Sequence, residues 1–411
     1  MSADILQSIA ESYVKLVLGV GQHDADYVDA YFGPKDLLDR AKAEKKPLSV
    51  LRVEALDLLK RLQSISREGW EEIEILRHLY LTKQISALVG RVEMLDGRKF
   101  SFDGEAAVLY DANPPTYPES HFQSLLGGLG AILPGAGNVS GRYDTFKGAY
   151  VIPKEKLDAV FQEAIRECRK RTSAHIALPP NENFTIEYVT NKSWSGYNWY
   201  KGSGFSLIQM NTDLPIYIDR AIDLAAHEGY PGHHVYNSLL ESELFRKRGW
   251  IEFSVYALFS PQSLIAEGTA NFGIEVAFPG GERVQYEERS LFLLAGMDPS
   301  TTELYYRVHA LFLKLAYAGN EAARAYLNGT MTRAQAVEWL VTYALMSKER
   351  AEQRTRFFDT YRSYVINYNL GQDLVRGYIE RRGGTSDKPA RRWEEFKKLI
   401  SSPRLPSGLA G

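Results

Sequence analysis

The segment that most restricts how this chain can fold is residues 227–234, which read HEGYPGHH. An apolar helical pattern leads into the segment, but two glycines and Pro231 interrupt it. Pro231 cannot donate the backbone hydrogen bond that the carbonyl of His227 would accept in a continuous helix. We therefore expect a bend or bulge between His227 and the paired histidines His233 and His234.

The same segment contains the groups that a hydrolytic zinc site needs, neutral imidazoles to hold the ion and a carboxylate to act as base. On a straight helix His233 would lie about 120° from the face of His227, and His234 would return to that face about 10.5 Å away. A bulge that absorbs two residues would bring His233 into place. We predict His227 and His233 as ligands, with His234 as the alternative to His233. Glu228 is the predicted general base.

A third protein ligand is expected from the helical stretch SLIAEGTANFGIE, residues 263–275. Glu267 lies among small and apolar residues there and is the predicted ligand, which gives a site for one zinc ion. Glu275, two helical turns further on, is the fallback. A purely structural zinc site is disfavoured because such sites are closed mainly by thiolates, and Cys168 is the single cysteine of the chain.

Two stretches rich in β-prone residues, 184–190 and 204–211, are predicted to form the only sheet. The second could align an extended peptide by backbone hydrogen bonds. Residues 191–203 between them are dense in aromatics and glycine, which favours a ligand-facing loop. Its aromatic side chains are the predicted substrate-binding wall, with a packed aromatic cluster as the alternative reading: Trp194, Tyr197, Trp199 and Tyr200.

Most of the remaining chain shows helical periodicity, so the predicted fold class is mainly α with one small β-sheet (α+β). Residues 100–149 are rich in glycine and proline and are expected to be a loop that crosses the surface or lines a cleft. No linker divides the chain, which predicts a single catalytic domain over residues 1–400 and a flexible tail over 401–411. The helices are expected near 4–18, 50–64, 70–95, 153–172, 301–318, 321–327 and 333–358.

Composition argues against several classes of partner. The 49 Lys and Arg residues nearly balance the 51 Asp and Glu residues, and a net charge of −2 offers no broad field for nucleic acid or an anionic membrane. No apolar run reaches the roughly 20 residues that would span a bilayer. The first residues carry no basic head followed by an apolar stretch, so we expect a cytoplasmic protein. The oligomeric state is not predicted.

On these residues the chain resembles a family of unknown function in the gluzincin clan of zinc metallopeptidases. The signature of that family is HE, two variable residues and PGHH, and it is accompanied by an EGxA segment that matches residues 267–270. The resemblance implies a mostly helical gluzincin fold with a deep cleft, distantly similar to carboxypeptidase Taq and angiotensin-converting enzyme. It also implies that a tyrosine of the late helices steadies the oxyanion; Tyr368 matches best, Tyr364 is the alternative, and either could be a core aromatic.

The predicted function is a zinc-dependent hydrolase, a metallopeptidase that cleaves peptide bonds through a zinc-activated water. One alternative is a zinc hydrolase of small non-peptide amide or acyl conjugates, because the same chemistry serves any carbonyl. Another is a non-catalytic metal-binding or peptide-binding protein. Four arginines on the late helices are candidate carboxylate receptors, without an assignment among them: Arg307, Arg354, Arg356 and Arg362.

Overall fold

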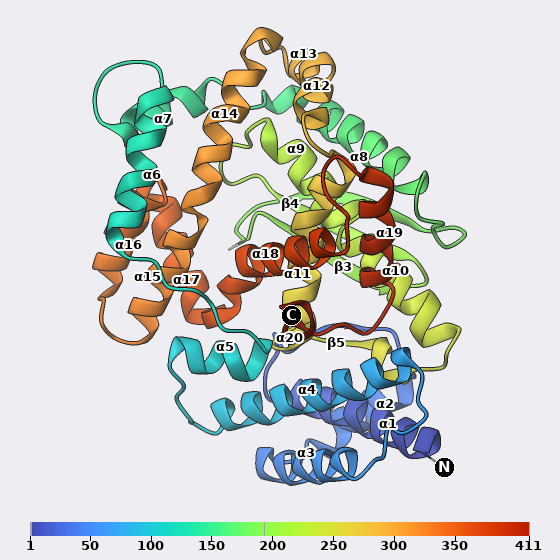
Figure 1. The fold of residues 1–411 in the computed structure, drawn as a ribbon. Helices are drawn as coiled ribbons and strands as arrows, with labels where there is room; N and C mark the ends of the chain where they lie inside the picture. The colour runs from blue at the N-terminus through green and yellow to red at the C-terminus, as the bar shows by residue number, and fades with distance from the viewer. Residues whose placement is uncertain (1, 193, 411) are drawn as a thin grey trace.

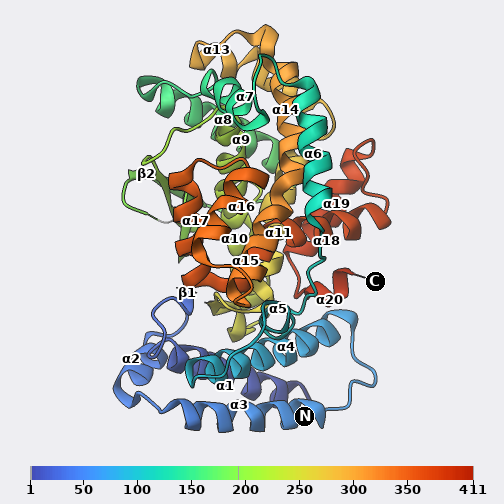
Figure 2. The ribbon, with the colours of Figure 1, turned by 90° about the vertical axis from the view of Figure 1, so that its left-hand side faces the viewer.

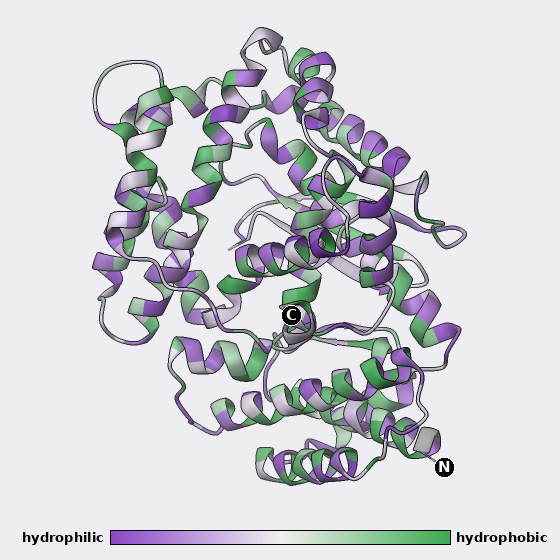
Figure 3. Ribbon diagram, viewed as in Figure 1, coloured by the Kyte–Doolittle hydropathy of each residue, from purple (hydrophilic) through white to green (hydrophobic). Residues whose placement is uncertain are grey.

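Four helices near the N-terminus form a layer at one end of the molecule (Figure 1). The computed structural model describes residues 2–192 and 194–410. The apolar residues of these helices recur at helical spacing and pack into a common core. Figure 3 shows the resulting alternation of hydrophobic and hydrophilic residues along α3. The helices are α1 (Ser2–Val20), α2 (Lys35–Glu44), α3 (Leu48–Gln63) and α4 (Glu72–Leu95).

Residues 100–149 are largely helical, and the prediction of a surface loop is wrong. Their glycines and prolines lie mainly near helix ends. Ser101 and Asn138 cap two of the helices, each accepting a hydrogen bond from the backbone N–H three residues later, at 3.1 and 2.8 Å. Pro118 directly precedes another helix, where its missing donor does no harm. The helices are α5 (Phe102–Tyr110), α6 (Glu119–Ile132) and α7 (Val139–Gly148).

A three-stranded sheet contains the two predicted strands, as β2 (Asn183–Val189) and β4 (Phe205–Asn211). The strand order is β2–β4–β3, with β4 parallel to β2 and antiparallel to β3. β3 (Gly196–Gly202) lies where a loop was predicted, which is a correction: its backbone pairs with β4 along most of its length. A second sheet of β1 (Val28–Tyr31) and β5 (Val255–Ala257) was also missed, because such short strands show no clear alternation.

The helices of the middle of the chain follow the three-stranded sheet or pack beside it. The HEGYPGHH segment begins in a π-helical turn that continues α9 and ends in α10. These elements are α8 (Leu157–Ser173), α9 (Asp219–Leu224), the π-helical turn Ala225–Gly229, α10 (His233–Leu239), a second π-helical turn at Leu240–Arg246 and α11 (Pro261–Ala277).

The late helices confirm the helical character predicted for residues 301–358 but divide it differently. Thr332 and Gln335 form a capping box at the start of one of these helices, in which each side chain accepts a hydrogen bond from the backbone N–H of the other. The helix expected over 333–358 is broken between Tyr343 and Lys348. The helices are α12 (Glu282–Arg289), α13 (Leu291–Ala295), α14 (Thr302–Leu313), α15 (Tyr317–Leu327), α16 (Arg333–Tyr343), α17 (Lys348–Tyr361), α18 (Ile366–Arg381), α19 (Pro389–Ile400) and α20 (Pro406–Leu409).

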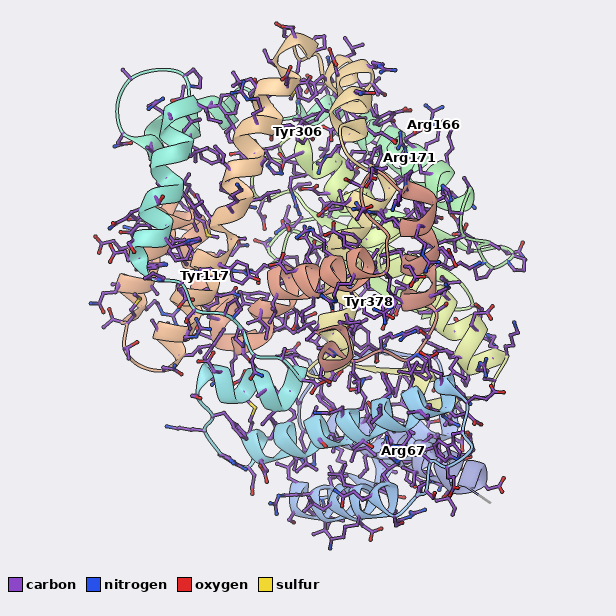
Figure 4. All side chains as sticks on the ribbon, viewed as in Figure 1. Arg67, Tyr117, Arg166, Arg171, Tyr306 and Tyr378 are labelled. Carbon is purple, nitrogen blue, oxygen red and sulfur yellow. The ribbon has the colours of Figure 1, made fainter. Side chains whose placement is uncertain are left out.

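Helices α11 and α18 cross at the centre of the molecule, between α14–α17 on one side and α8, α10 and α19 on the other (Figures 1 and 2). They touch through glycines: a Cβ on Gly268 would lie 2.5 Å from the carbonyl carbon of Gly371, so a larger residue would force the backbones apart. α11 is mostly buried, and side chains fill the spaces between the ribbons around it (Figure 4). The crossing places α18 directly against Glu267.

The end of the chain packs against the body, and the predicted flexible tail over 401–411 is wrong for the residues that the structure describes. Leu409 is fully buried, and its carbonyl accepts a hydrogen bond from Arg381 on α18. The few apolar residues of this segment are sufficient to anchor it. In the described part of the chain no helix is both long and apolar enough to cross a bilayer. The single-domain organisation stays a prediction.

Candidate metal centre

The predicted interruption of the HEGYPGHH helix is present in the structure. The backbone N–H of Tyr230 donates to the carbonyl five residues earlier at 3.0 Å, and that of Gly232 to the carbonyl six residues earlier at 2.9 Å. A Cβ on Gly232 would lie 1.9 Å from the carbonyl oxygen of His227, so only glycine fits there. Helix α10 then restarts at His233.

The bend brings the predicted ligands His227, His233 and Glu267 together. The Nε2 atoms of the two histidines lie 3.1 Å apart. Oε2 of Glu267 lies 3.3 Å from Nε2 of His227 and 3.7 Å from Nε2 of His233. All three ligand atoms are within 4.8 Å of one another, and little of each side chain is exposed. Two nitrogens and a carboxylate oxygen therefore converge on one point.

A neighbouring amide fixes the orientation of the first histidine. Oδ1 of Asn271 lies 2.9 Å from Nδ1 of His227, and Nδ2 of Asn271 donates to the carbonyl of Tyr368 at 2.9 Å. Because the amide nitrogen is committed to that carbonyl, Nδ1 of His227 must be the donor to Oδ1, which leaves the lone pair of Nε2 free. Asn271 was not predicted, although its position four residues after Glu267 places it on the same helix face.

The charges of the cluster are mutually stabilising. Burial alone would raise the pKa of Glu267, but its contacts with His227 and His233 hold the pKa well below the usual value. Burial alone would lower the pKa of His233, but the hydrogen bond and charge of Glu267, with smaller contributions from Glu228 and Asp29, raise it to about 9. The site therefore attracts positive charge, whether a proton or a metal ion.

The residues present fit a metal ion. Oε2 of Glu267 is buried, and its only polar neighbours among the described residues are the imidazole nitrogens of His227 and His233, at 3.3 and 3.7 Å. A buried carboxylate is costly unless positive charge compensates it. Two imidazole nitrogens and one carboxylate oxygen form a donor set that suits zinc and leaves a position open for water or substrate. His227, His233 and Glu267 would hold such an ion.

The two alternative ligands are held elsewhere. His234 is fully buried, with Nδ1 2.8 Å from Oγ of Ser206 and Nε2 2.8 Å from Oε2 of Glu182. Adjacent helical residues project about 100° apart, which explains why it points away from His233. Glu275 forms an ion pair with Arg376 at 2.5 Å. Neither side chain reaches the triad.

Glu228 lies beside the triad with a free carboxylate. Its side chain is buried and forms no hydrogen bond or ion pair with the described residues, whereas its backbone carbonyl accepts a hydrogen bond from Asn198 at 2.7 Å. A Cβ on Gly196 would lie 2.8 Å from Oε1 of Glu228, so the bare backbone of β3 borders this carboxylate. Glu228 is thus available for proton transfer.

The two candidate tyrosines occupy different positions. The hydroxyl of Tyr364 donates to Oε1 of Glu267 at 2.8 Å and is committed to that contact. Tyr368 lies one turn further, with its ring 5.9 Å from that of Tyr364, and its hydroxyl forms no hydrogen bond within the described chain. Burial raises the pKa of Tyr368 most, and the charges of Glu267 and Glu228 raise it further, so both carboxylates are near. Of the two tyrosines, Tyr368 is therefore the one whose hydroxyl is free to donate a hydrogen bond to a ligand.

The structure brings three of the four predicted wall aromatics together. The ring of Tyr197 lies 5.5 Å from that of Trp194 and 4.5 Å from that of Trp199. Tyr200 is a correction: it is buried and donates to Glu241 on the side of the sheet that faces α10. Strand alternation places neighbouring side chains on opposite faces, so Trp199 and Tyr200 could not line one wall.

Asp29 on β1 was missed by the sequence analysis. It accepts a hydrogen bond from the hydroxyl of Tyr197, and its charge is close enough to act on His233. Burial raises the pKa of Asp29 to about 6, against the opposing effects of Tyr197 and His233. Nothing in the surrounding sequence DADYVDAYFG distinguishes it, because its proximity depends on the pairing of β1 with β5.

Comparison with known structures supports the fold of the chain but does not show its chemistry. The chain is similar to a candidate lipoprotein from Colwellia psychrerythraea at a TM-score of 0.52 and 14% identity, over 87% of this chain and 69% of that one. A second candidate lipoprotein, of unknown function, from Shewanella oneidensis is similar at a TM-score of 0.49 and 14% identity, over 91% of this chain and 75% of that one. Metallocarboxypeptidase 1 of Trypanosoma cruzi is similar at a TM-score of 0.49 and 12% identity, over 98% of this chain and 93% of that one.

No family model matches the chain, and no curated protein is significantly similar to it in sequence. At such low identity, structural likeness describes only the fold. The predicted mainly helical fold with a small sheet is confirmed. The resemblance to the HExxPGHH family and to angiotensin-converting enzyme stays a prediction, as does the deep cleft.

Proposed function

We propose that the protein is a zinc-dependent hydrolase, a metallopeptidase whose ion is held by His227, His233 and Glu267. One observation carries the proposal: three ligand atoms within 4.8 Å of one another meet beside the unpaired carboxylate of Glu228. A structural metal site would be fully closed by protein ligands and would not need a free base beside it.

The chain supplies the acid–base groups for hydrolysis. Bound zinc would supply Lewis-acid chemistry, polarising a carbonyl and lowering the pKa of a water. Glu228 is the group that accepts the proton of the attacking water and passes it to the leaving nitrogen. The free hydroxyl of Tyr368 is the donor that would stabilise the negative oxygen that develops on the attacked carbonyl. Asn271 and Tyr364 hold His227 and Glu267 in place.

A peptide is favoured over a small conjugate because a strand at the edge of the sheet borders the base. β4 pairs on both sides and cannot align a peptide, contrary to the prediction for residues 204–211. β3 forms an edge of the sheet, and it carries both Gly196 beside Glu228 and Asn198 on the backbone of Glu228. An edge strand can bind an extended substrate through backbone hydrogen bonds.

The decisive variant is Glu228→Gln, which keeps the shape of the side chain and removes its basicity. We expect kcat to fall by about 10²–10⁴-fold because general-base catalysis is lost, while zinc content stays unchanged. Glu288→Gln, at an exposed position, is the matched control. Zinc retained with full hydrolytic activity in E228Q would refute the assigned base. Cleavage of acyl conjugates without cleavage of any peptide in a mixed library would replace the peptidase with the conjugate hydrolase.

A further inference from the structure

Two arginines on α17 have no anionic partner in the structure. Arg350 and Arg354 are four residues apart and so lie on one face of the helix. Neither forms an ion pair with a described residue. Arg354 is half-buried, its guanidinium carbon lies 4.6 Å from the ring centroid of Phe357 and 5.8 Å from that of Tyr368, and its Nε is buried without a hydrogen-bond partner.

The other arginines proposed as carboxylate receptors differ from Arg354. Arg362 donates to Glu105 at 2.6 Å and is therefore satisfied within the chain. Arg307 and Arg356 are exposed to solvent. Buried arginines elsewhere follow the general rule and face a carboxylate, as Arg77 does with Glu252 at 2.6 Å. Arg354 differs from these arginines because its guanidinium contacts aromatic rings and, among the described residues, no carboxylate.

Tyr368 places Arg354 beside the candidate metal centre. The guanidinium of Arg354 lies over the ring of Tyr368, the same residue whose pKa responds to Glu267 and Glu228. Arg354 thus lies one aromatic ring from the hydrolytic residues.

Arg350 extends the positive surface toward β3. Gln353, between the two arginines, donates to the carbonyl of Lys192 at 2.9 Å and ties α17 to the segment that precedes β3. The charge of Arg220 on α9 acts on Arg350, and Arg220 itself approaches Ser195 at 3.4 Å. Ser195 directly precedes Gly196, the residue that borders Glu228. Arg350 and Arg354 therefore lie on a helix that contacts the segment leading into β3, the strand that is proposed to bind substrate.

Such an arrangement is unfavourable without an anion. Like charges four residues apart on a helix repel each other. Burial lowers the pKa of Arg354, and the neighbouring Arg350 lowers it further. Desolvating a guanidinium without a counter-ion costs free energy, which the contacts with the rings of Phe357 and Tyr368 offset only in part. Arginine forks are matched in shape to carboxylates, which they bind through two parallel hydrogen bonds.

We propose that Arg354, assisted by Arg350, is a receptor for a carboxylate group of the substrate. The proposal rests on the proposed function, because it places the receptor next to the same hydrolytic centre. The carboxylate has two possible sources, a free peptide C-terminus or an acidic side chain near the cleaved bond. Both would meet the guanidinium in the same way, so the substrates must separate them.

The test compares three peptides: Ala-Phe-Leu with a free C-terminus, its C-terminal amide, and the amide of Ala-Phe-Glu. Cleavage by the wild-type protein is compared with Arg354→Gln, Arg350→Gln and the exposed control Arg356→Gln, all checked for zinc content and melting temperature. We expect wild type to prefer a carboxylate-bearing peptide over the plain amide by at least about 100-fold in kcat/KM, since a desolvated charged hydrogen bond is lost with the amide. R354Q should erase that preference, R350Q reduce it, and R356Q preserve it.

The outcomes separate the receptor from the hydrolase. Preference for the free acid identifies the C-terminus as the source, and preference for the glutamyl amide identifies the side chain. Equal cleavage of all three peptides by wild type, or an unchanged preference in R354Q, overturns the receptor and leaves the peptidase standing. If no peptide is cleaved, the proposed function fails. The receptor is then judged by calorimetric binding of Ala-Phe-Leu and its amide to wild type and R354Q: weaker binding of the acid alone in R354Q supports it, and equal binding overturns it.

Discussion

Among the residues that the structure describes, two clusters have the spacing of a metal site, and they differ in the charges that already neutralise them. The first cluster is the triad of His227, His233 and Glu267. In the second, the side chains of Asp219, Asp223 and His309 also place ligand atoms within 4.8 Å of one another. The second cluster lies where α9 meets α14, and it was not predicted. Its three residue types are as suitable for zinc as those of the triad.

The second cluster is occupied by cations of the chain itself. Lys147 contacts Asp219 at 2.9 Å, and Arg283 contacts Asp223 at 2.8 Å. Burial alone would raise the pKa of Asp219, but His309 and Lys147 hold it far below its usual value. The triad has no lysine or arginine against Glu267 in the described chain. Proximity of donors is therefore insufficient: the cluster that can take a metal is the one whose carboxylate is balanced, among the described residues, by an imidazole proton that a metal can displace.

The largest expected difference is in zinc binding by paired histidine variants. His233→Ala removes one of three ligands and should weaken zinc affinity by about 10³-fold or more, beyond the 10–100-fold typical of losing an outer partner. His309→Ala should leave zinc affinity unchanged. Competition with a chromogenic chelator measures both. Equal losses in the two variants would show that the clusters do not differ as described.

The second contrast concerns folding stability. Lys147→Met leaves Asp219 buried without its cation and should lower the free energy of unfolding by about 3–5 kcal/mol. Lys398→Met removes the pairs of an exposed lysine with Glu394 and Glu395 and should have a much smaller effect, because solvent screens exposed ion pairs. Urea denaturation of metal-free protein provides the comparison. A small effect of K147M would mean that lysine is not what neutralises the second cluster.

A smaller effect is expected from the amide that orients His227. Asn271→Ala frees the imidazole to rotate and to change tautomer, which should reduce zinc affinity by about 10–100-fold. Asn271→Asp should restore part of the loss, because a carboxylate accepts the same hydrogen bond from His227 but cannot donate to the carbonyl of Tyr368. Zinc affinity that is insensitive to both substitutions would contradict the assigned tautomer.

The smallest expected effect is the change of zinc affinity with pH. The pKa of His233 is raised to about 9, so in metal-free protein the imidazole is protonated below that pH. Zinc must displace this proton, and its affinity should therefore rise about tenfold per pH unit up to about pH 9 and then level off. Isothermal titration in buffers of different ionisation enthalpy counts the proton released. Release of no proton at pH 7 would contradict this account.

The local sequence was sufficient to predict which three side chains come together in the triad, but not which residues surround them. The Pro-Gly interruption predicted the bend, and the bend places His233 rather than His234 beside His227. Asp29 and Arg354 could not be selected in the same way, because they reach the centre through strand pairing and helix crossing between distant parts of the chain. Residues 100–149 were misread because glycine and proline were counted as loop formers where they stand near helix ends.

Diffraction from crystals of the purified protein, with data collected on both sides of the zinc absorption edge, tests the central claim most directly. The account predicts one anomalous peak, bounded by Nε2 of His227, Nε2 of His233 and the carboxylate of Glu267, and none at the second cluster. A peak between Asp219 and His309, or a zinc ion bound with Glu267 turned away from it, would contradict the account.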